Sequence, residues 1–217
     1  MDREMILKRL ENGLIVSCRS MQFDDFSIDS NCKMPDIERV VKAGNVAGVR
    51  ANTIRDIASV KSLTDLPVIG SIKRRYQDSN VCVTVTMQEV DELVGCGVDV
   101  IAIQGTSDLR PDYKAAADFI RDIKRKYPNQ LIMADIATFN EAMNCAVAGA
   151  DFVSTAMRGH TCDTRGVIMP DYAIITHLAT RCGARIIAEG NIDCLEMAKA
   201  TLKAGAFAVV VEGTACF

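Results

Sequence analysis

A short pattern of polar and apolar positions recurs five times along the chain. In each copy an amphipathic stretch ends at a glycine, an apolar run follows, and the run ends in a polar or small residue. Glycine ends helices readily because it adopts positive φ at no steric cost, and an apolar run without alternation is typical of a strand buried on both faces. The pattern therefore predicts a repeated helix–glycine–strand unit. The copies are AGNVAGVRANT (43–53), CGVDVIAIQGT (96–106), AGADFVSTAMRG (148–159), CGARIIAEGN (182–191) and AGAFAVVVEGT (204–214).

The same interpretation extends to the rest of the chain and predicts eight buried strands with helical patterns between them. Strands that alternate with helices in this way favour a single (β/α)8 TIM-barrel domain over residues 1–217. The rival is an open doubly wound sheet, but no GxGxxG fingerprint follows the first strand. The predicted strands are Leu14–Ser17, Ala47–Arg50, Val68–Ile72, Val100–Ile103, Leu131–Ala134, Phe152–Thr155, Arg185–Ala188 and Ala208–Val211.

Capping signals set the predicted helix boundaries. Thr86 with Glu89, and Thr138 with Glu141, have the spacing of capping boxes. Pro35 opens an earlier helical pattern, where its missing N–H costs nothing. The later helices and their expected caps are Ile54–Ser62 after Thr53, Met87–Cys96 after Thr86, Tyr113–Lys126 after Asp112, Phe139–Val147 after Thr138, Tyr172–Thr180 after Asp171 and Cys194–Lys203 after Asp193.

Two segments depart from the regular repeat. The stretch Arg74–Thr86 is long, polar and then rich in β-formers, and we interpret it as an ordered loop beyond the third strand. Long loops of this kind are often functional lids. The sequence also stops at Phe217, directly after the eighth predicted strand, so we expect the barrel to lack its closing helix. We expect a partner subunit to cover the apolar surface left there, which predicts a homodimer.

Composition narrows the function classes. The net charge of −3 argues against nucleic acid as the main partner. Nine cysteines show no CxxC pair and no zinc spacing, which favours a reducing, cytoplasmic environment and no metal centre. The N-terminal segment lacks the apolar core of a signal peptide, and no run approaches the roughly 18 apolar residues of a membrane span.

Two residues at predicted strand ends are candidates for acid–base chemistry, because TIM barrels keep their chemistry at that face. Lys73 follows the apolar run PVIGSI, and desolvation together with cations such as Arg50 would lower its pKa and make it a base. Glu189 follows IIA, where a carboxylate is unfavourable unless it is paired. The alternatives are a solvated loop lysine and a structural ion pair.

Other strand ends carry candidate binding residues. Arg50 could bind an anion or a sugar oxygen, or pair with a neighbouring carboxylate. Asp135, after LIMA, could bind substrate or accept from loop N–H groups. Gly190, Gly213 and Thr214 end the last two strands, where phosphate-binding barrels cradle phosphate with backbone N–H groups, although such glycines are also common in turns.

These residues and their surroundings resemble the N-acetylmannosamine-6-phosphate 2-epimerases. The resemblance runs over essentially the whole chain to Thr214, and it implies a phosphate-binding TIM barrel. It also implies an isomerase that interconverts N-acetylmannosamine 6-phosphate and N-acetylglucosamine 6-phosphate in sialic acid catabolism, without a metal or redox cofactor. The segments that carry it are LIVSC (14–18), VRANT (49–53), PVIGSIKRRYQDS (67–79), VTVTMQEVDEL (83–93), YPNQLIMADIATFNEA (127–142) and IIAEGNI (186–192).

The resemblance also implies roles. Lys73 falls on the family's catalytic lysine, which exchanges the proton at C2 of the amino sugar, and Glu189 falls on the acidic residue that works with it. Arg50 and Asp135 fall on sugar-binding positions.

Four positions depart from the family pattern: Arg19 replaces a Gln, Gln104 an Asp, Asn191 an Arg and Glu212 a Gly. The changes at 191 and 212 remove a cation and add an anion where phosphate is expected, and we expect Arg19 and Arg158 to compensate as substrate-binding residues. Two alternatives stay open: a divergent sugar-phosphate lyase or isomerase that uses Lys73 as a Schiff base, and a non-catalytic sugar-phosphate sensor.

Overall fold

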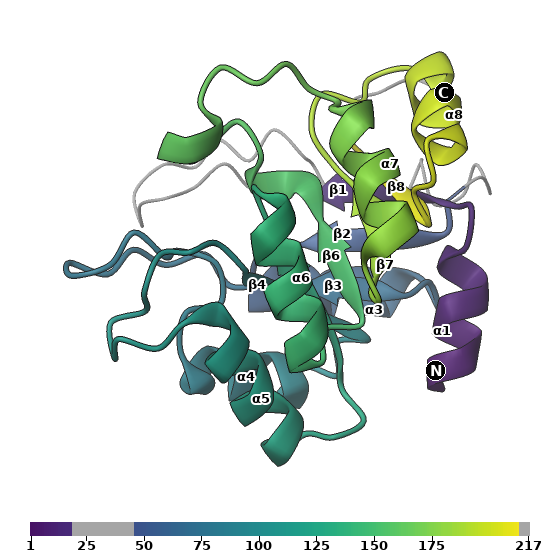
Figure 1. Ribbon diagram of the computed structural model, residues 1–217. Coiled ribbons are helices and arrows are strands. Elements are labelled where there is room, and N and C mark those ends of the chain that lie inside the picture. The colour runs from purple at the N-terminus through teal and green to yellow at the C-terminus, as the bar shows by residue number, and fades with distance from the viewer. Residues whose placement is uncertain (19–45, 213–217) are drawn as a thin grey trace.

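The eight predicted strands close into one parallel barrel. In the computed structural model each strand pairs with the next in chain order, and β8 pairs with β1 (Figure 1). The structure describes residues 1–18 and 46–212, with Cys18 and Glu212 described by their backbone alone. The (β/α)8 prediction is therefore confirmed. The strands are β1 (Leu14–Cys18), β2 (Gly48–Ala51), β3 (Val68–Gly70), β4 (Val100–Gln104), β5 (Leu131–Asp135), β6 (Phe152–Ser154), β7 (Arg185–Ala188) and β8 (Ala208–Glu212).

Helices alternate with the strands and surround the barrel. The glycines that follow three of them, Gly97, Gly149 and Gly205, have positive φ, as the repeated pattern predicts. The helix expected after Pro35 and any segment beyond Glu212 lie outside the described residues. The α-helices are α1 (Arg3–Leu10), α3 (Ile54–Leu63), α4 (Met87–Gly95), α5 (Ala116–Lys126), α6 (Phe139–Ala148), α7 (Tyr172–Arg181) and α8 (Leu195–Lys203), and two short 3-10 helices are η1 (Thr155–Met157) and η2 (Cys162–Thr164).

Two predicted helix starts were wrong. The helix expected from Tyr113 begins at Ala116, because Tyr113 has a φ of +62° and its N–H donates to the Arg110 carbonyl in a turn. Asp193 was expected to cap the last helix, but the N-cap is Cys194. A single sequence signal, an Asp before an apolar stretch, does not fix a boundary when the preceding loop has turns of its own.

Strand residues alternate between the barrel interior and the helical layer. On β4, Val100 and Ala102 belong to the interior cluster, while Ile101 and Ile103 pack under the helices. Helix α1 contributes Ile6 and Leu10 to the interior cluster and so closes the N-terminal end of the barrel. The last inward position of each strand therefore lies at the opposite, C-terminal end, which we call the barrel mouth.

The long connection after β3 folds back onto the barrel mouth. Lys73 and Val83 form an antiparallel bridge, and the Gln104 N–H at the end of β4 donates to the Val83 carbonyl at 2.9 Å. The segment thus lies over the rim between β3 and β4 without entering the barrel, which confirms the predicted ordered loop. In Figure 1 it extends to the left, on the same side as the connections after β4 and β6, whereas α1 lies on the right.

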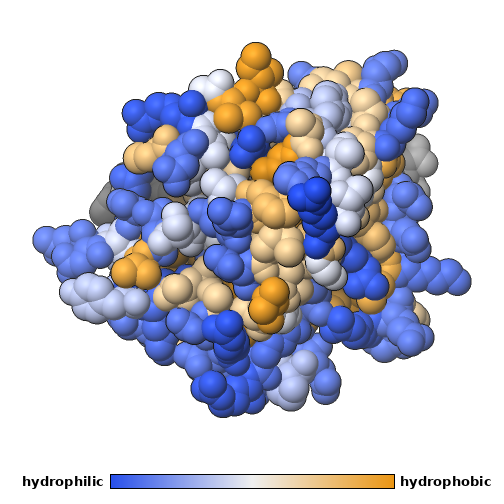
Figure 2. Space-filling view, in the orientation of Figure 1, coloured by the Kyte–Doolittle hydropathy of each residue, from blue (hydrophilic) through white to orange (hydrophobic). Residues whose placement is uncertain are grey.

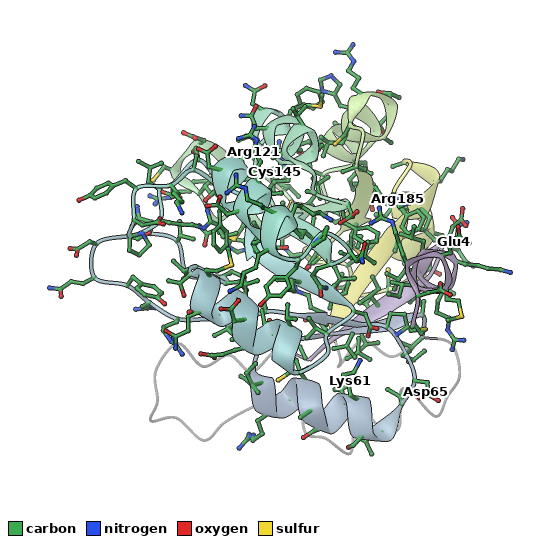
Figure 3. The ribbon with its side chains drawn as sticks, turned by 90° about the horizontal axis from the view of Figure 1, so that it is seen from below. Glu4, Lys61, Asp65, Arg121, Cys145 and Arg185 are labelled. Atoms are coloured by element: carbon green, nitrogen blue, oxygen red, sulfur yellow. The ribbon has the colours of Figure 1, made fainter. Side chains whose placement is uncertain are left out.

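The outer surface is mainly hydrophilic, with ion pairs at the N-terminal end. Figure 2 shows hydrophilic residues around α4 and α5, and hydrophobic ones gathered over α6 and α7. Figure 3 labels Glu4, Lys61 and Arg185 on the side of α1, away from the long connections. There Lys61 pairs with Asp99 at 3.2 Å. Among the helices that the described residues form, none has the length and apolar character that crossing a bilayer requires.

Candidate active site

Three charged side chains from distant parts of the chain meet at the barrel mouth. Arg50 comes from the end of β2, Asp135 from the end of β5, and Glu189 directly follows β7. The Arg50 guanidinium donates to both Asp135 oxygens, with Nη1 to Oδ1 at 3.2 Å and Nη2 to Oδ2 at 2.5 Å, and its Nη1 also donates to Glu189 Oε2. All three residues are at most 4% exposed. The structure thus brings together three of the predicted site residues.

The cluster holds two carboxylates on one guanidinium. Burial alone would lower the pKa of Arg50, but the charges of Asp135 and Glu189 outweigh it and raise that pKa above its ordinary value. Burial raises the pKa of Asp135, and the Glu189 charge adds to the rise, while Arg50 and Lys73 oppose it. Arg50 is therefore a permanent cation, and burial disfavours the ionised form of Asp135.

Residues at the end of β6 hold Glu189 in place. The Thr155 hydroxyl accepts from the Glu189 N–H at 2.9 Å and donates to the Glu189 carbonyl at 2.8 Å. The Ser154 hydroxyl donates to Glu189 Oε2 at 3.3 Å. Thr155 thus fixes both the N–H and the carbonyl of Glu189, and Oε2 of its side chain accepts from two donors, Arg50 and Ser154. The Glu189 side chain therefore has little freedom to move.

Lys73 lies at the rim of the mouth, two residues beyond the inward-facing position after β3. The residue is half-buried, and its backbone pairs with Val83 in the returning loop. Its charge lowers the pKa of Asp135, so the ammonium lies within electrostatic range of the cluster. It also acts on the Cys82 thiol, whose pKa is raised by burial. Lys73 is thus a rim lysine that lies within electrostatic range of the buried Asp135 carboxyl.

The backbone after β7 takes left-handed conformations. Gly190 has a φ of +122° and Asn191 one of +50°. The backbone conformation favours glycine here, and a Cβ added at Gly190 would also come within 2.7 Å of Met169 Cε and displace that methyl group. This local shape exposes backbone at a strand end, where the phosphate cradle was predicted.

Arg158 does not contact the charged cluster. Its Nε donates to Asp171 Oδ2 and its Nη1 to the Ala137 carbonyl, both at 2.7 Å. Asp171 is also the N-cap of α7, so Arg158 links the connections after β5 and β6 to that helix. The structure gives Arg158 a structural partner set, and its substrate-binding role stays a prediction. The predicted residues Arg19, Gly213 and Thr214 lie outside the described part of the chain.

Sequence reasoning missed the residues that support the charged ones. Ser154 and Thr155 end an apolar strand in the third copy of the repeat, so their position was a signal, but their types suggested no chemistry. Across residues 1–18 and 46–212, no three His, Cys, Asp or Glu side chains gather in a way that could hold a metal ion. The arrangement can bind an anionic or hydroxylated ligand and move protons by means of a lysine and carboxylates.

The fold and this cluster define a TIM barrel with a buried cluster of charged residues at the carboxyl ends of its strands. The family described as "Putative N-acetylmannosamine-6-phosphate epimerase" matches residues 34–216. A relative named "Putative N-acetylmannosamine-6-phosphate 2-epimerase", from Caldanaerobacter subterraneus subsp. tengcongensis, is 39% identical over 97% of this chain and 87% of that protein. One of the same name from Shouchella clausii is 39% identical over 96% of this chain and 91% of that protein. The chain belongs to the N-acetylmannosamine-6-phosphate epimerase family.

Solved structures agree with this assignment. The N-acetylmannosamine-6-phosphate 2-epimerase from Clostridium perfringens superposes with a TM-score of 0.86 at 33% identity, covering 97% of this chain and 90% of that one. A thiamine phosphate pyrophosphorylase from Pyrococcus furiosus superposes with a TM-score of 0.61 at 18% identity, which shows a shared fold alone.

Proposed function

We propose that this protein is an isomerase that interconverts N-acetylmannosamine 6-phosphate and N-acetylglucosamine 6-phosphate by proton transfer at C2. The observation that carries the proposal is the Arg50–Asp135–Glu189 cluster at the barrel mouth, with Lys73 in electrostatic range, in a chain of this family. The substrate is a phosphorylated amino sugar, and the pathway served is the catabolism of sialic acid and related amino sugars.

The chemistry requires a base, an acid and a stabilised oxygen. The C2 proton is acidic only beside a carbonyl, so the pyranose first opens to the C1 aldehyde. Lys73 then removes the proton, and the electron pair moves onto the carbonyl oxygen to give an enolate. Donors and cations around that oxygen stabilise it in a site shielded from water. Return of a proton to the opposite face of C2 inverts the centre and regenerates the aldehyde. No redox step or cofactor is needed.

Glu189 and Asp135 take complementary parts in this proposal. Glu189 is held by Thr155 and Arg50, so it can assist ring opening or orient Lys73 without moving. Asp135 and Arg50 bind sugar oxygens, since a guanidinium and a carboxylate at the same mouth offer both donors and acceptors to hydroxyl groups.

The phosphate end is proposed at the ends of β7 and β8. Gly190 supplies left-handed backbone there, and Gly213 and Thr214 would complete the cradle with their N–H groups. Arg19 and Arg158 would supply charge in place of the arginine that Asn191 replaces. For Arg158 this requires exchange of its present partner Asp171 for the phosphate.

Two further parts of the proposal concern the whole molecule. The six cysteines that the structure describes as unpaired support a reducing, cytoplasmic environment. The homodimer stays a prediction, and multi-angle light scattering at micromolar concentration tests it, because a stable monomer would contradict it.

The test is direct. The purified protein is incubated with N-acetylmannosamine 6-phosphate in H₂O, and the anomeric and C2 protons are followed by NMR. Appearance of N-acetylglucosamine 6-phosphate, and the reverse reaction from that sugar, is the expected result. A folded protein that leaves both sugars unchanged contradicts the proposal, and trapping of Lys73 by borohydride with other carbonyl substrates would then favour a Schiff-base enzyme.

A further inference from the structure

Gln104 ends β4 on the inner side of the barrel and is almost completely buried. The residue is 1% exposed, and its register partner on β5 is Asp135 of the charged cluster. Val100 and Ala102, which lie on the same face of β4 as Gln104, both belong to the interior cluster. Gln104 therefore belongs to the ring of inward positions at the barrel mouth, although its side-chain hydrogen bonds go to Cys82 and Thr106 and not to the charged cluster.

Every kind of polar group on Gln104 is hydrogen-bonded. Its N–H donates to the Val83 carbonyl, and its carbonyl accepts from Arg110 Nη2, both at 2.9 Å. In the side chain, Oε1 accepts from the Cys82 N–H and Nε2 donates to the Thr106 hydroxyl, again at 2.9 Å each. The carboxamide thus connects two loops, the returning segment Val81–Val85 and the loop that follows β4.

The returning segment holds the chain on both sides of Lys73. The Arg74 N–H donates to the Cys82 carbonyl at 2.9 Å, and the Thr84 N–H donates to the Ile72 carbonyl at 2.8 Å. The Thr84 hydroxyl also accepts from the Ile72 N–H at 3.2 Å. The residues before and after Lys73 are therefore both paired to a segment that is anchored in turn by Gln104.

The tip of the same excursion is fixed to the loop after β4. The Ser79 hydroxyl donates to the Leu109 carbonyl at 2.7 Å, and Asn80 Nδ2 donates to Asp108 Oδ1 at 3.2 Å. Figure 1 shows the excursion beside the connection that follows β4. These tip contacts are exposed, whereas the Gln104 contacts lie at the base of the excursion next to Lys73. The less exposed contacts of Gln104 should therefore have the larger effect on where Lys73 lies.

We propose that Gln104 is a positioning residue for Lys73, acting through the Val81–Val85 segment. This inference rests on the function proposed above. A base must lie within hydrogen-bonding reach of the proton it removes, and a displacement of about 1 Å can reduce the rate about a hundredfold. By fixing Cys82, Gln104 sets the distance of Lys73 from the cluster without touching substrate itself.

Substitutions at position 104 separate this role from packing. Gln104→Leu keeps the approximate volume and removes both side-chain hydrogen bonds. Gln104→Glu keeps an acceptor for the Cys82 N–H, and the Thr106 hydroxyl, which donates to Asp108 Oδ2 at 3.1 Å, can turn to donate to the new carboxylate instead. A carboxylate at this position also adds negative charge near Lys73, which favours the protonated lysine. Gln88→Leu on the exposed face of α4 is the matched control, since it removes a glutamine whose partner is Glu92.

The first measurement is steady-state kinetics as a function of pH. We expect Gln104→Leu to lower kcat about thirtyfold and to change KM less than about threefold. We expect Gln104→Glu to recover most of the kcat at high pH, with the acidic limb of its kcat/KM profile moved to higher pH. Gln88→Leu should match the wild type. A wild-type kcat in Gln104→Leu, or a decrease that follows the unfolded fraction, overturns the inference.

Amide hydrogen exchange provides a readout that does not depend on activity. In Gln104→Leu, exchange at Arg74 and Thr84 should rise at least tenfold, with little change in the amides of α6 or in Gln88→Leu. Unchanged exchange at Arg74 and Thr84 overturns the inference whether or not the enzyme is active. If the wild type lacked epimerase activity, the proposed function would fail. Faster exchange at the Arg74 and Thr84 amides of Gln104→Leu would still show that Gln104 fixes the backbone around Lys73.

Discussion

Two buried arginines lie near the barrel mouth, and they differ in their partners. Arg50 is 4% exposed and bonds two carboxylates from β5 and the end of β7. Arg110 is 2% exposed, donates through Nη2 to the Gln104 carbonyl, and stacks over the Phe119 ring at 4.2 Å. Its Nε and Nη1 have no hydrogen-bond partner among the described residues. The two arginines are thus buried to a similar degree, but Arg50 is paired with two carboxylates and Arg110 hydrogen-bonds to none in the part of the chain that the structure describes.

The pKa values follow the partners. Burial lowers the pKa of Arg110 to about 10, and the weaker electrostatic effects of Cys145 and Asp112 oppose it. The pKa of Arg50 is raised despite its burial, because Asp135 and Glu189 outweigh the desolvation. Burial alone therefore does not distinguish a cation at a charged site from one that supports a loop. Arg50 is joined to a site assembled from three strands, whereas Arg110 supports one loop and the helix α5.

The largest expected effect comes from removing the cation that the two carboxylates share. Arg50→Met leaves Asp135 and Glu189 buried and facing each other, so we expect a loss of about 3–5 kcal/mol in the free energy of unfolding and no detectable epimerase activity. Urea unfolding and the NMR assay measure both. Arg55→Met, at an arginine with an 88% exposed side chain, is the control. A stability within about 1 kcal/mol of the wild type would show that the Arg50 cluster is not the interdependent unit described.

Glu189→Gln keeps a hydrogen-bond acceptor for Arg50 and removes one negative charge. We expect the rate to fall about 10²–10⁴-fold, the usual range for a lost acid–base group, while the protein stays folded. The same change should lower the pKa of Asp135, because the Glu189 charge raises it in the wild type.

The pH dependence of stability checks the change at Asp135. A carboxyl whose pKa is raised on folding stabilises the protein below its unfolded pKa, and that contribution is lost as the pH rises through the folded pKa. With a lower folded pKa, Glu189→Gln should lose less stability than the wild type as the pH rises from about 4. Parallel curves from urea unfolding would contradict the coupling of the two carboxyls.

The smallest expected effect is at the other buried arginine. Arg110→Met removes one hydrogen bond and a ring contact, but it also removes a desolvated charge without a carboxylate partner, so stability should stay within about 1 kcal/mol of the wild type. Above pH 10 the wild type can release the Arg110 proton and should gain stability relative to the variant. A loss of 3 kcal/mol or more at neutral pH would mean that Arg110 has an essential partner.

The difference between the two arginines also shows what the sequence could predict. Arg50, Asp135 and Glu189 each follow an apolar run, and in a barrel the ends of such runs share one face, so their meeting was predictable from position. Arg110 lies in an irregular loop after β4, where the sequence has no regular spacing of apolar residues that would indicate burial. Gln104 was noticed as a departure from the family, but its partners Cys82 and Thr106 depend on how the long excursion folds back, which local sequence does not determine.

In the proposed reaction, Lys73 moves the C2 proton beside the Arg50 cluster. The most direct measurement is incubation with N-acetylmannosamine 6-phosphate in D₂O, with the C2 proton followed by NMR for the wild type, Lys73→Ala and the exposed control Lys199→Ala. We predict N-acetylglucosamine 6-phosphate with deuterium at C2 from the wild type and the control, and neither exchange nor epimer from folded Lys73→Ala. Continued exchange in Lys73→Ala would contradict the role of Lys73 as the base, because another group would then have to remove the proton.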